Sequence, residues 1–297
     1  MRMKPTAFDY IRPTSLPEAL AILAEHSDDV AILAGGQSLM PLLNFRMSRP
    51  ALVLDINDIS ELQQVRCEND TLYVGSMVRH CRVEQEEIFR STIPLMSEAM
   101  TSVAHIQIKT RGTLGGNLCN AHPASEMPAV ITALGASMVC KSEKRGERVL
   151  TPEEFFQGAL QNGLQSDELL CEIRIPVPSQ YVGWAFEEVA RRHGDFAQCG
   201  AAVLIGAEDR KIDYARIALC SIGETPIRFH ALEQWLIGRP VGNDLPADVK
   251  LHCREILDVA EDSTMTAENR AKLASAVTSR AIARAADRIV HLDVKRG

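Results

Sequence analysis

The chain has 297 residues, of which 46% are hydrophobic and 24% are charged, a composition typical of a soluble globular protein with a substantial core. No apolar run approaches the roughly 18 to 20 residues of a membrane span. No apolar segment follows the basic N-terminus, so we expect a cytoplasmic protein without a secretory signal. The net charge of −7, with no run of basic residues, disfavours nucleic acid as a partner.

The eight cysteines are widely and irregularly spaced, and none forms a C-x-x-C pair. Iron–sulfur clusters and structural zinc sites usually have clustered ligands. We therefore expect free thiols, several of them packed in the core, and no metal bound by this chain. If the chain takes part in electron transfer, its electrons have to arrive from another polypeptide.

Strand and helix signals alternate in the N-terminal part of the chain. The capping-box pattern Ser15-Leu16-Pro17-Glu18 begins an amphipathic helix, and a short apolar run after it ends abruptly at Ala34-Gly35-Gly36-Gln37-Ser38. This alternation predicts an α/β unit. Its expected elements are strands over 8–13, 30–33 (buried) and 52–56, and helices over 16–26 and 39–46.

The middle of the chain holds further strands, helices and a second glycine-rich stretch. The polar turn Glu68-Asn69-Asp70 lies between two strand candidates and predicts a hairpin. The second glycine stretch is Thr110-Arg111-Gly112-Thr113-Leu114-Gly115-Gly116-Asn117, and Thr151-Pro152-Glu153-Glu154 is another capping box. The expected elements are strands over 62–67, 71–76 and 137–140, and helices over 92–106, 128–134 and 151–156.

The composition shifts at Ile175-Pro176-Val177-Pro178-Ser179, which we take as a domain boundary. Strands are expected beyond it over 184–190, 199–206 and 215–222, followed by a long helix over about 266–290. One side of that helix is apolar. Arg280, Arg284 and Arg288 form a stripe on the other side, which we expect to be a solvated helix face.

The two glycine pairs, Gly35-Gly36 and Gly115-Gly116, carry the main functional signal. A diphosphate needs several backbone N–H donors brought close to it with no Cβ atom in the way, and tandem glycines allow that approach. Ser38, Thr113 and Asn117 can add side-chain hydrogen bonds, and a helix beginning at Ser38 would favour an anion. Neither stretch is G-x-G-x-x-G or contains G-K-[ST], so a Rossmann fingerprint and an NTPase phosphate loop are both excluded.

A family resemblance names the ligand. Ala34-Gly35-Gly36-Gln37-Ser38-Leu39-Met40-Pro41 and the following Asn44-Phe45-Arg46 resemble the first flavin motif of the medium subunits of molybdenum hydroxylases. Thr113-Leu114-Gly115-Gly116-Asn117, with Pro123-Ala124-Ser125-Glu126, resembles the second motif. The likeness covers most of the chain, including Leu170…Ile173-Arg174-Ile175-Pro176 and Arg191-Arg192-His193-Gly194-Asp195-Phe196.

The resemblance implies an α+β fold in two domains. An FAD-binding domain similar to that of vanillyl-alcohol oxidase (the PCMH type) would span 1–176, with two α/β subdomains over about 1–57 and 58–176. A smaller α+β C-terminal domain of the carbon monoxide dehydrogenase flavoprotein type would span 177–297 and hold an antiparallel sheet and helices.

The resemblance also implies which residues hold FAD. The two glycine motifs would bind the diphosphate and ribityl chain, Ser125 and Glu126 would contact adenosine or ribityl hydroxyls, and Leu170 would pack near the flavin. Asp195 and Phe196 are expected near the isoalloxazine ring. The residues of the two motifs are Leu33, Ala34, Gly35, Gly36, Gln37, Ser38, Leu39, Thr113, Gly115, Gly116 and Asn117.

In that family this subunit transfers electrons and has no catalytic side chain of its own. The resemblance implies a heterotrimer with a small subunit carrying two [2Fe–2S] clusters and a large subunit carrying a molybdopterin cofactor, where water hydroxylates the substrate. The flavin then passes electrons to an external acceptor. Related systems act on carbon monoxide, acyl thioesters, aldehydes and N-heteroaromatic compounds, and Gln37 in the first motif favours an N-heteroaromatic substrate such as a purine, pyridine or quinoline.

Two further places in the sequence bear on the expected flavin site. Relatives often carry a lysine where this chain has Glu187 or Glu188, and loss of a cation near the flavin would lower its potential or change the acceptor. His122 and Cys119 lie beside the second motif, and in more distant flavoproteins such residues attach the flavin covalently. Here we expect an ordinary loop residue and a packed thiol.

Two other functions stay open from the sequence. One is a stand-alone flavin oxidase or reductase that completes its reaction without partners. The other is a scaffold without enzymatic activity, in which the glycines only form turns.

Overall fold

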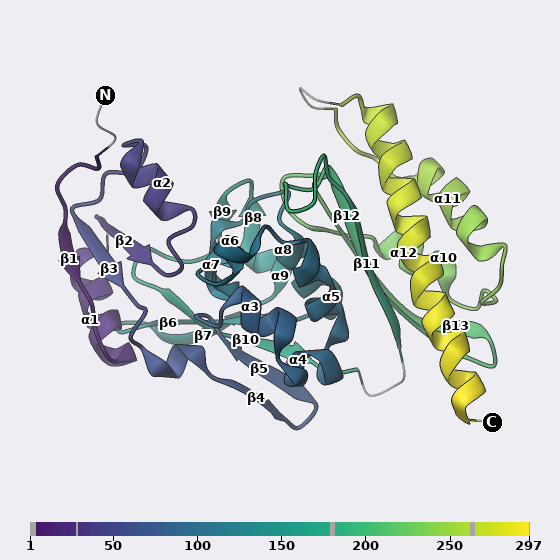
Figure 1. The fold of residues 1–297 in the computed structure, drawn as a ribbon, viewed down its shortest axis with the longest axis horizontal. Helices are drawn as coiled ribbons and strands as arrows, with labels where there is room; N and C mark the ends of the chain where they lie inside the picture. The colour runs from purple at the N-terminus through teal and green to yellow at the C-terminus, as the bar shows by residue number, and fades with distance from the viewer. Residues whose placement is uncertain (1–3, 28, 179–181, 262–264, 297) are drawn as a thin grey trace.

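The computed structural model describes residues 4–27, 29–178, 182–261 and 265–296, with the backbone alone from 290 onward. Figure 1 shows three main sheets that follow one another from the N-terminus to the C-terminus, with helices between and beside them. The expected α+β fold with an antiparallel C-terminal sheet is confirmed. Ser179, the last residue of the expected domain boundary, lies outside the described residues.

The first sheet is parallel and has the strand order β1-β3-β2. Helix α1 begins as expected, because the Ser15 hydroxyl accepts a hydrogen bond from the backbone N–H of Glu18 and Pro17 lies in the first turn. Strand β2 is only half-buried, because it is an edge strand rather than the buried strand we expected. The elements are β1 (Asp9–Ile11), α1 (Leu16–His26), β2 (Val30–Leu33), α2 (Leu39–Asn44) and β3 (Leu52–Asp55).

The second sheet is antiparallel, with the order β4-β5-β10-β6-β7, and helices pack over it. Its strands are β4 (Val65–Glu68), β5 (Thr71–Gly75), β6 (Ser137–Ser142), β7 (Gly146–Leu150) and β10 (Leu169–Pro176). The other elements are η1 (Ser60–Gln63), α3 (His80–Gln85), α4 (Glu87–Thr92), α5 (Pro94–Ser102), α6 (Ile106–Lys109), α7 (Leu114–Asn120), α8 (Glu126–Leu134), α9 (Pro152–Phe155), β8 (Phe156–Gly158) and β9 (Gln161–Asn162).

The expected helix over 92–106 is wrong, because the structure divides this stretch between three helices. Pro94 has no N–H to continue α4 and instead occupies the first turn of α5. Helix α5 ends at Ser102, where Val103 is extended and Ala104 adopts a left-handed conformation with φ 43°. The backbone therefore changes direction twice within residues 92–106, where the apolar spacing alone had predicted one continuous helix.

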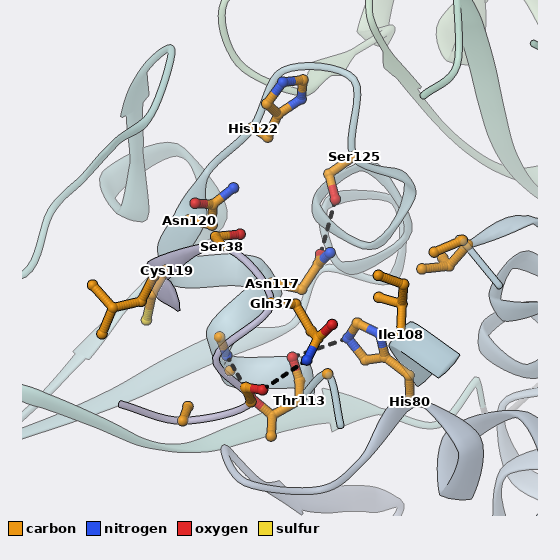
Figure 2. A pocket seen from close by; sticks show the side chains of 18 of the residues that line it. Gln37, Ser38, His80, Ile108, Thr113, Asn117, Cys119, Asn120, His122 and Ser125 are labelled. Atoms are coloured by element: carbon orange, nitrogen blue, oxygen red, sulfur yellow. Dashed lines mark hydrogen bonds between the residues drawn. The ribbon is translucent and has the colours of Figure 1, made fainter. Parts of the chain in front are cut away.

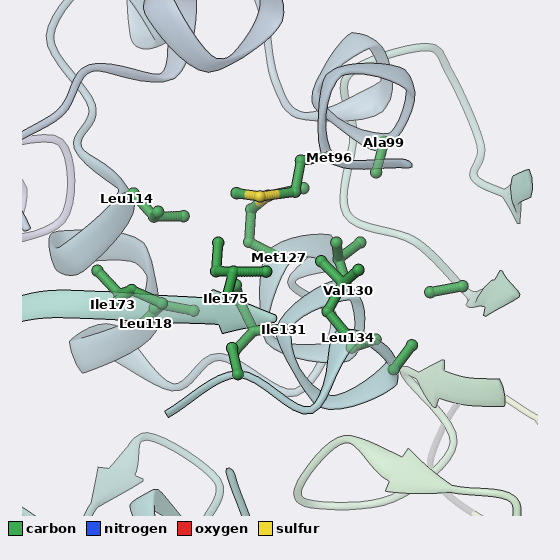
Figure 3. Close-up of a cluster of buried hydrophobic side chains, with 14 of the residues drawn as sticks. Met96, Ala99, Leu114, Leu118, Met127, Val130, Ile131, Leu134, Ile173 and Ile175 are labelled. Carbon is green, nitrogen blue, oxygen red and sulfur yellow. The ribbon is translucent and has the colours of Figure 1, made fainter. Parts of the chain in front are cut away.

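The third sheet is antiparallel, with the order β11-β12-β13-β14, and it is covered on both faces. Alternate residues of β12 enter different cores: Ala202 and Leu204 pack with α5 and α8, whereas Ala201 and Val203 pack with the C-terminal helices. Helix α8 is buried along its whole length, and its apolar side chains meet those of α5, α7 and β10 (Figure 3). The elements are β11 (Gly183–Val189), β12 (Cys199–Glu208), β13 (Lys211–Cys220), β14 (Ile227–Arg228), α10 (His230–Leu236), α11 (Leu245–Ile256) and α12 (Ala267–Arg296).

The arginine stripe on α12 is partly exposed, as expected for Arg280 and Arg284, but its arginines also pair with carboxylates of neighbouring elements. Arg284 and Arg288 pair with Glu98 of α5 at 3.0 and 2.5 Å, and Arg284 also pairs with Glu187 of β11. Glu98 further accepts the backbone N–H of Phe186 at 2.9 Å. A single carboxylate of α5 thus links two elements of the C-terminal sheet layer, and the helical pattern alone could not reveal the acidic partners.

Replacing Glu98 with glutamine should destabilise the fold. The Glu98 side chain is 19% exposed and bonded to two guanidinium groups, so loss of its charge should lower the free energy of unfolding by about 1–2 kcal/mol. Urea unfolding measures this, with Glu25→Gln as the control because the Glu25 side chain is 78% exposed. Equal stability of the two variants would show that the α5–α12 contact contributes little.

Candidate functional site

A cavity of about 1070 Å³ opens where the first glycine stretch, the second glycine stretch and the C-terminal sheet layer meet. Pockets for drug-sized ligands measure roughly 300–1,000 Å³, so this cavity suits a dinucleotide-sized molecule. The first stretch supplies the turn between β2 and α2, and the second supplies the start of α7. Asp195, Phe196 and Ser221 reach the cavity from the β11–β12 loop and the end of β13.

The structure brings together nearly all the residues that the sequence predicted for the site. Figure 2 shows Gln37 and Ser38 of the first motif close to Thr113, Asn117 and Ser125 of the second. Leu33 is the exception: it ends β2, and its carbonyl accepts the backbone N–H of Ile56 at 3.1 Å. The predicted residues that line the cavity are Ala34, Gly35, Gly36, Gln37, Ser38, Leu39, Thr113, Gly115, Gly116, Asn117, Ser125, Glu126, Leu170, Asp195 and Phe196.

The glycines allow the two stretches to approach each other. A Cβ atom on Gly35 would lie 2.4 Å from the carbonyl oxygen of Arg111, which precedes the second glycine motif. A Cβ atom on Gly115 would lie 2.5 Å from Ser76 Cβ. Gly36 has φ +75°, a conformation that side-chain-bearing residues rarely adopt. Close packing of backbone on backbone, as well as space for a ligand, therefore requires these glycines.

In the first stretch, the backbone carbonyl groups and the backbone N–H groups differ in whether they have a hydrogen-bond partner among the described residues. The carbonyl of Gly35 accepts the Gln37 side-chain amide at 3.0 Å, and the carbonyl of Gly36 accepts the backbone N–H of Met40 at 3.1 Å. In the described part of the chain, the backbone N–H groups of Gly36, Gln37 and Ser38 have no acceptor. Such a run of free donors beside a cavity fits an anionic ligand such as a diphosphate.

Ser38 does precede a helix, but α2 has only six residues and the Ser38 hydroxyl makes no capping bond. Thr113, by contrast, caps α7, because its hydroxyl accepts the backbone N–H of Gly116 at 3.1 Å. The Ser125 hydroxyl donates to the side-chain oxygen of Asn117 at 3.0 Å (Figure 2). Two predicted residues from the two parts of the second motif are thus joined at the cavity wall.

Glu126 is the most perturbed carboxyl group at the cavity. It lies at the start of α8 and is only 4% exposed. Burial raises its pKa to about 7, and the nearby negative charge of Glu188 adds to the rise. A carboxyl group with this pKa can hold or release a proton near neutral pH.

The rim facing the C-terminal sheet is aromatic. His122 stacks on Phe196 with ring centroids 4.1 Å apart and an angle of 12° between the planes. The Nδ1 atom of His122 accepts the backbone N–H of Ala124 at 3.2 Å, so a neutral ring carries its proton on Nε2. Cys119 also lines the cavity, and burial raises the pKa of its thiol to about 12, which keeps it protonated at neutral pH.

His80 is a cavity residue that the sequence did not reveal. It is 4% exposed, and this burial lowers its pKa to about 4 and keeps the ring neutral. Its Nε2 atom donates to the carbonyl of Thr113 at 2.9 Å, a hydrogen bond that opposes the fall in pKa without cancelling it. No motif marked it in the sequence, where it lies between the β4–β5 hairpin and the second glycine stretch. Other polar residues of the wall were also not singled out as site residues from the sequence: His105, Asn120, Asn162, Gln165 and Arg191.

Glu187 and Glu188 do not line the cavity. Glu187 faces α12, where it pairs with Arg280 and Arg284. Burial raises the pKa of Glu188 to about 6. Any effect of these glutamates on a bound ligand would therefore act from behind the cavity wall.

Comparison with known proteins identifies the family. A family model described as "FAD binding domain in molybdopterin dehydrogenase" matches residues 6–178, and another described as "CO dehydrogenase flavoprotein C-terminal domain" matches residues 184–285. The chain belongs to the FAD-binding medium subunits of the molybdenum hydroxylase family. This medium subunit is thus part of an oxidoreductase, and its cofactor is FAD.

The relatives of this medium subunit match it over almost its whole length. It is 37% identical over 287 residues to the 6-hydroxypseudooxynicotine dehydrogenase complex subunit alpha of Paenarthrobacter nicotinovorans, which covers 96% of this chain and 97% of the relative. It is 32% identical over 280 residues to the carbon monoxide dehydrogenase medium chain of Hydrogenophaga pseudoflava, covering 94% and 97%. The solved structure of quinoline 2-oxidoreductase from Pseudomonas putida 86 superposes with a TM-score of 0.91 at 34% identity, covering 97% and 99%.

None of the described helices of the medium subunit is both long and apolar enough to span a membrane. The cysteines are unpaired, and five of them (Cys140, Cys171, Cys199, Cys220 and Cys253) are buried. The prediction of free thiols packed in the core is confirmed for these five.

Replacing Glu126 with glutamine should change how stability depends on pH. The folded pKa of about 7 lies above the usual value, so the stability contributed by the protonated carboxyl is present at low pH and lost as the pH rises through 7. The E126Q variant should therefore gain on the order of 1–3 kcal/mol over the unaltered FAD-free chain at pH 8.5, and little at pH 5. Urea unfolding at both pH values tests this, and an equal effect at the two would refute the buried, ionising carboxyl.

Proposed function

We propose that this chain is the electron-transferring subunit of a heterotrimer. It would bind FAD, take electrons from the [2Fe–2S] clusters of a small partner subunit, and pass them to an external acceptor. A large partner subunit with a molybdopterin cofactor would hydroxylate the substrate with water. The observation that carries the proposal is the cavity itself, where two glycine motifs meet and the first of them has free backbone donors, in a chain of this family.

The proposal gives each predicted residue a role. The backbone donors of Gly36, Gln37 and Ser38 would bind the diphosphate, with Thr113 and Asn117 on the opposite side. The remaining motif residues would complete the diphosphate and ribityl site: Leu33, Ala34, Gly35, Leu39, Gly115 and Gly116. Ser125 and Glu126 would bind hydroxyl groups, Leu170 would pack on the flavin, and Asp195 and Phe196 would lie near its ring.

When bound, FAD supplies the redox chemistry, because it can accept single electrons and deliver two. The chain's own residues bind, orient and shield. The neutral His80 holds the Thr113 carbonyl, which keeps an acceptor oxygen of the second motif occupied. Phe196 and Leu170 present apolar surface that excludes water, and Glu126 can hold a proton near neutral pH.

We further propose an N-heteroaromatic substrate for the complex. Two of the relatives described above are named for such compounds, a nicotine derivative and quinoline, whereas the carbon monoxide dehydrogenase medium chain is less similar in sequence.

The proposed domain division falls near residue 176, as the change from the second sheet to the third supports.

Replacing Gly36 with leucine should abolish FAD retention. The residue has φ +75° and its Cβ atom would lie 3.2 Å from Met40 Cγ, so a side chain would strain and displace the loop. Gly146→Leu is a matched control, because Gly146 has φ +74° but has nothing within 4 Å of its Cβ position. Flavin released by acid from each purified variant is the readout. Normal flavin content in the G36L variant would contradict the proposed diphosphate site.

The substrate class has its own test. The purified heterotrimer should reduce a dye acceptor when given quinoline or a hydroxylated nicotine derivative, and should not respond to carbon monoxide. Dye reduction with carbon monoxide alone would overturn the assignment of substrate class while leaving the flavin site intact.

A further inference from the structure

Asn57 and Arg79 connect the two glycine stretches from behind the cavity, and neither residue lines it. The Asn57 side-chain amide donates to the carbonyl of Ala34 in the first stretch at 2.8 Å. Its amide oxygen accepts a guanidinium N–H of Arg79 at 2.5 Å. Another N–H of Arg79 donates to the carbonyl of Arg111 in the second stretch. Three hydrogen bonds thus run from one stretch to the other.

The Arg111 carbonyl is also the atom on which Gly35 packs. A Cβ atom on Gly35 would lie 2.4 Å from it, so this oxygen defines how closely the two stretches approach. Because Arg79 holds that oxygen, the guanidinium group controls the contact surface between the stretches. The same arginine reaches the first stretch through Asn57, and so fixes both sides of the contact.

Both residues are themselves held in place. The backbone N–H and side-chain amide of Asn57 donate to the Asp55 carboxylate at 3.0 and 2.5 Å, and Asp55 also accepts the Tyr10 hydroxyl at 2.5 Å. Arg79 lies on a segment that pairs with the second stretch: the backbone N–H of His80 donates to the Gly112 carbonyl at 3.0 Å. The network therefore rests on the first sheet at one end and on the second stretch at the other.

We propose that Asn57 and Arg79 are positioning residues that set the spacing of the two glycine stretches and hold their carbonyl oxygens away from the bound diphosphate. A carbonyl oxygen that turned towards the cavity would repel phosphate oxygens, whereas one bonded to Asn57 or Arg79 cannot turn without losing that hydrogen bond. This inference rests on the proposed FAD site. It predicts that FAD affinity depends on two side chains that do not touch the cavity.

The Arg79 charge alone offers a different explanation, since a cation behind the loops would also attract a diphosphate. Lysine keeps that charge, but its single ammonium group does not reproduce the planar fork that bonds Asn57 and Arg111 together. The Arg79→Lys variant therefore separates geometry from charge, and Arg79→Gln removes both.

The test is FAD binding to the full-length FAD-free chain, followed through the change in flavin absorbance and fluorescence on binding. Arg79→Lys, Arg79→Gln and Asn57→Ala should each weaken FAD binding by at least about tenfold. Because the residues act in one network, the N57A/R79Q double variant should be little worse than R79Q alone. Arg66→Gln is the control, because Arg66 of β4 pairs with Glu68 of the same strand and with Glu172 of β10, and does not line the cavity.

Each outcome decides something. Wild-type affinity in the R79K variant would overturn the positioning role in favour of charge, and wild-type affinity in R79Q and N57A would overturn any role for the pair. Failure of the unaltered chain to bind FAD would reject the proposed function itself, and the inference with it. Circular dichroism melting of each FAD-free variant shows whether it folds, and if R79Q does not, R79K and N57A still carry the test.

Discussion

The close contact between two backbone segments, Gly35 on the Arg111 carbonyl, is the constraint on which the rest of the site depends. It brings a turn from the parallel first sheet against the loop that begins α7, although the two are about 75 residues apart in sequence. Backbone packed this closely needs glycine, and it needs every carbonyl in the contact to have a donor. The free N–H groups of the first stretch then remain for a ligand.

The cavity also depends on how the C-terminal sheet sits against the helices of the second unit. Strand β12 contributes side chains to two cores, and α8, which carries Glu126 at its start, is buried between the sheets. The β11–β12 loop is therefore held over the cavity by a shared core rather than by a loose linker. Glu98, with its arginine partners on α12, adds a polar link across the same junction.

Local signals predicted the elements that begin with a cap or follow a clear period. Helix α1 was found over its full length because Ser15, Pro17 and the apolar spacing agree. The expected helix over 92–106 failed because the apolar period continued across Pro94 and Ala104, where the backbone changes direction. Helices α3 and α7 were not predicted: α3 is short, and α7 contains the Gly115-Gly116 pair that disfavours a helix in isolation.

Resemblance to known motifs predicted the residues of the candidate site more completely than it predicted the fold. Almost every predicted residue lines the cavity, because the glycine motifs carry local, recognisable backbone requirements. His80, Asn57 and Arg79 were missed because their roles arise from contacts across long sequence separations. The ion pairs of the arginine stripe of α12 were missed for the same reason, since their acidic partners lie on α5 and β11.

The most direct test of this account is a flavin analysis of the assembled complex. Acid precipitation should release intact FAD in an amount equal to that of this chain, and the remaining protein should carry no flavin. A fully active complex that releases no flavin, and whose chain carries none on His122 or Cys119, would contradict the central claim that the two glycine stretches hold an electron-transferring FAD.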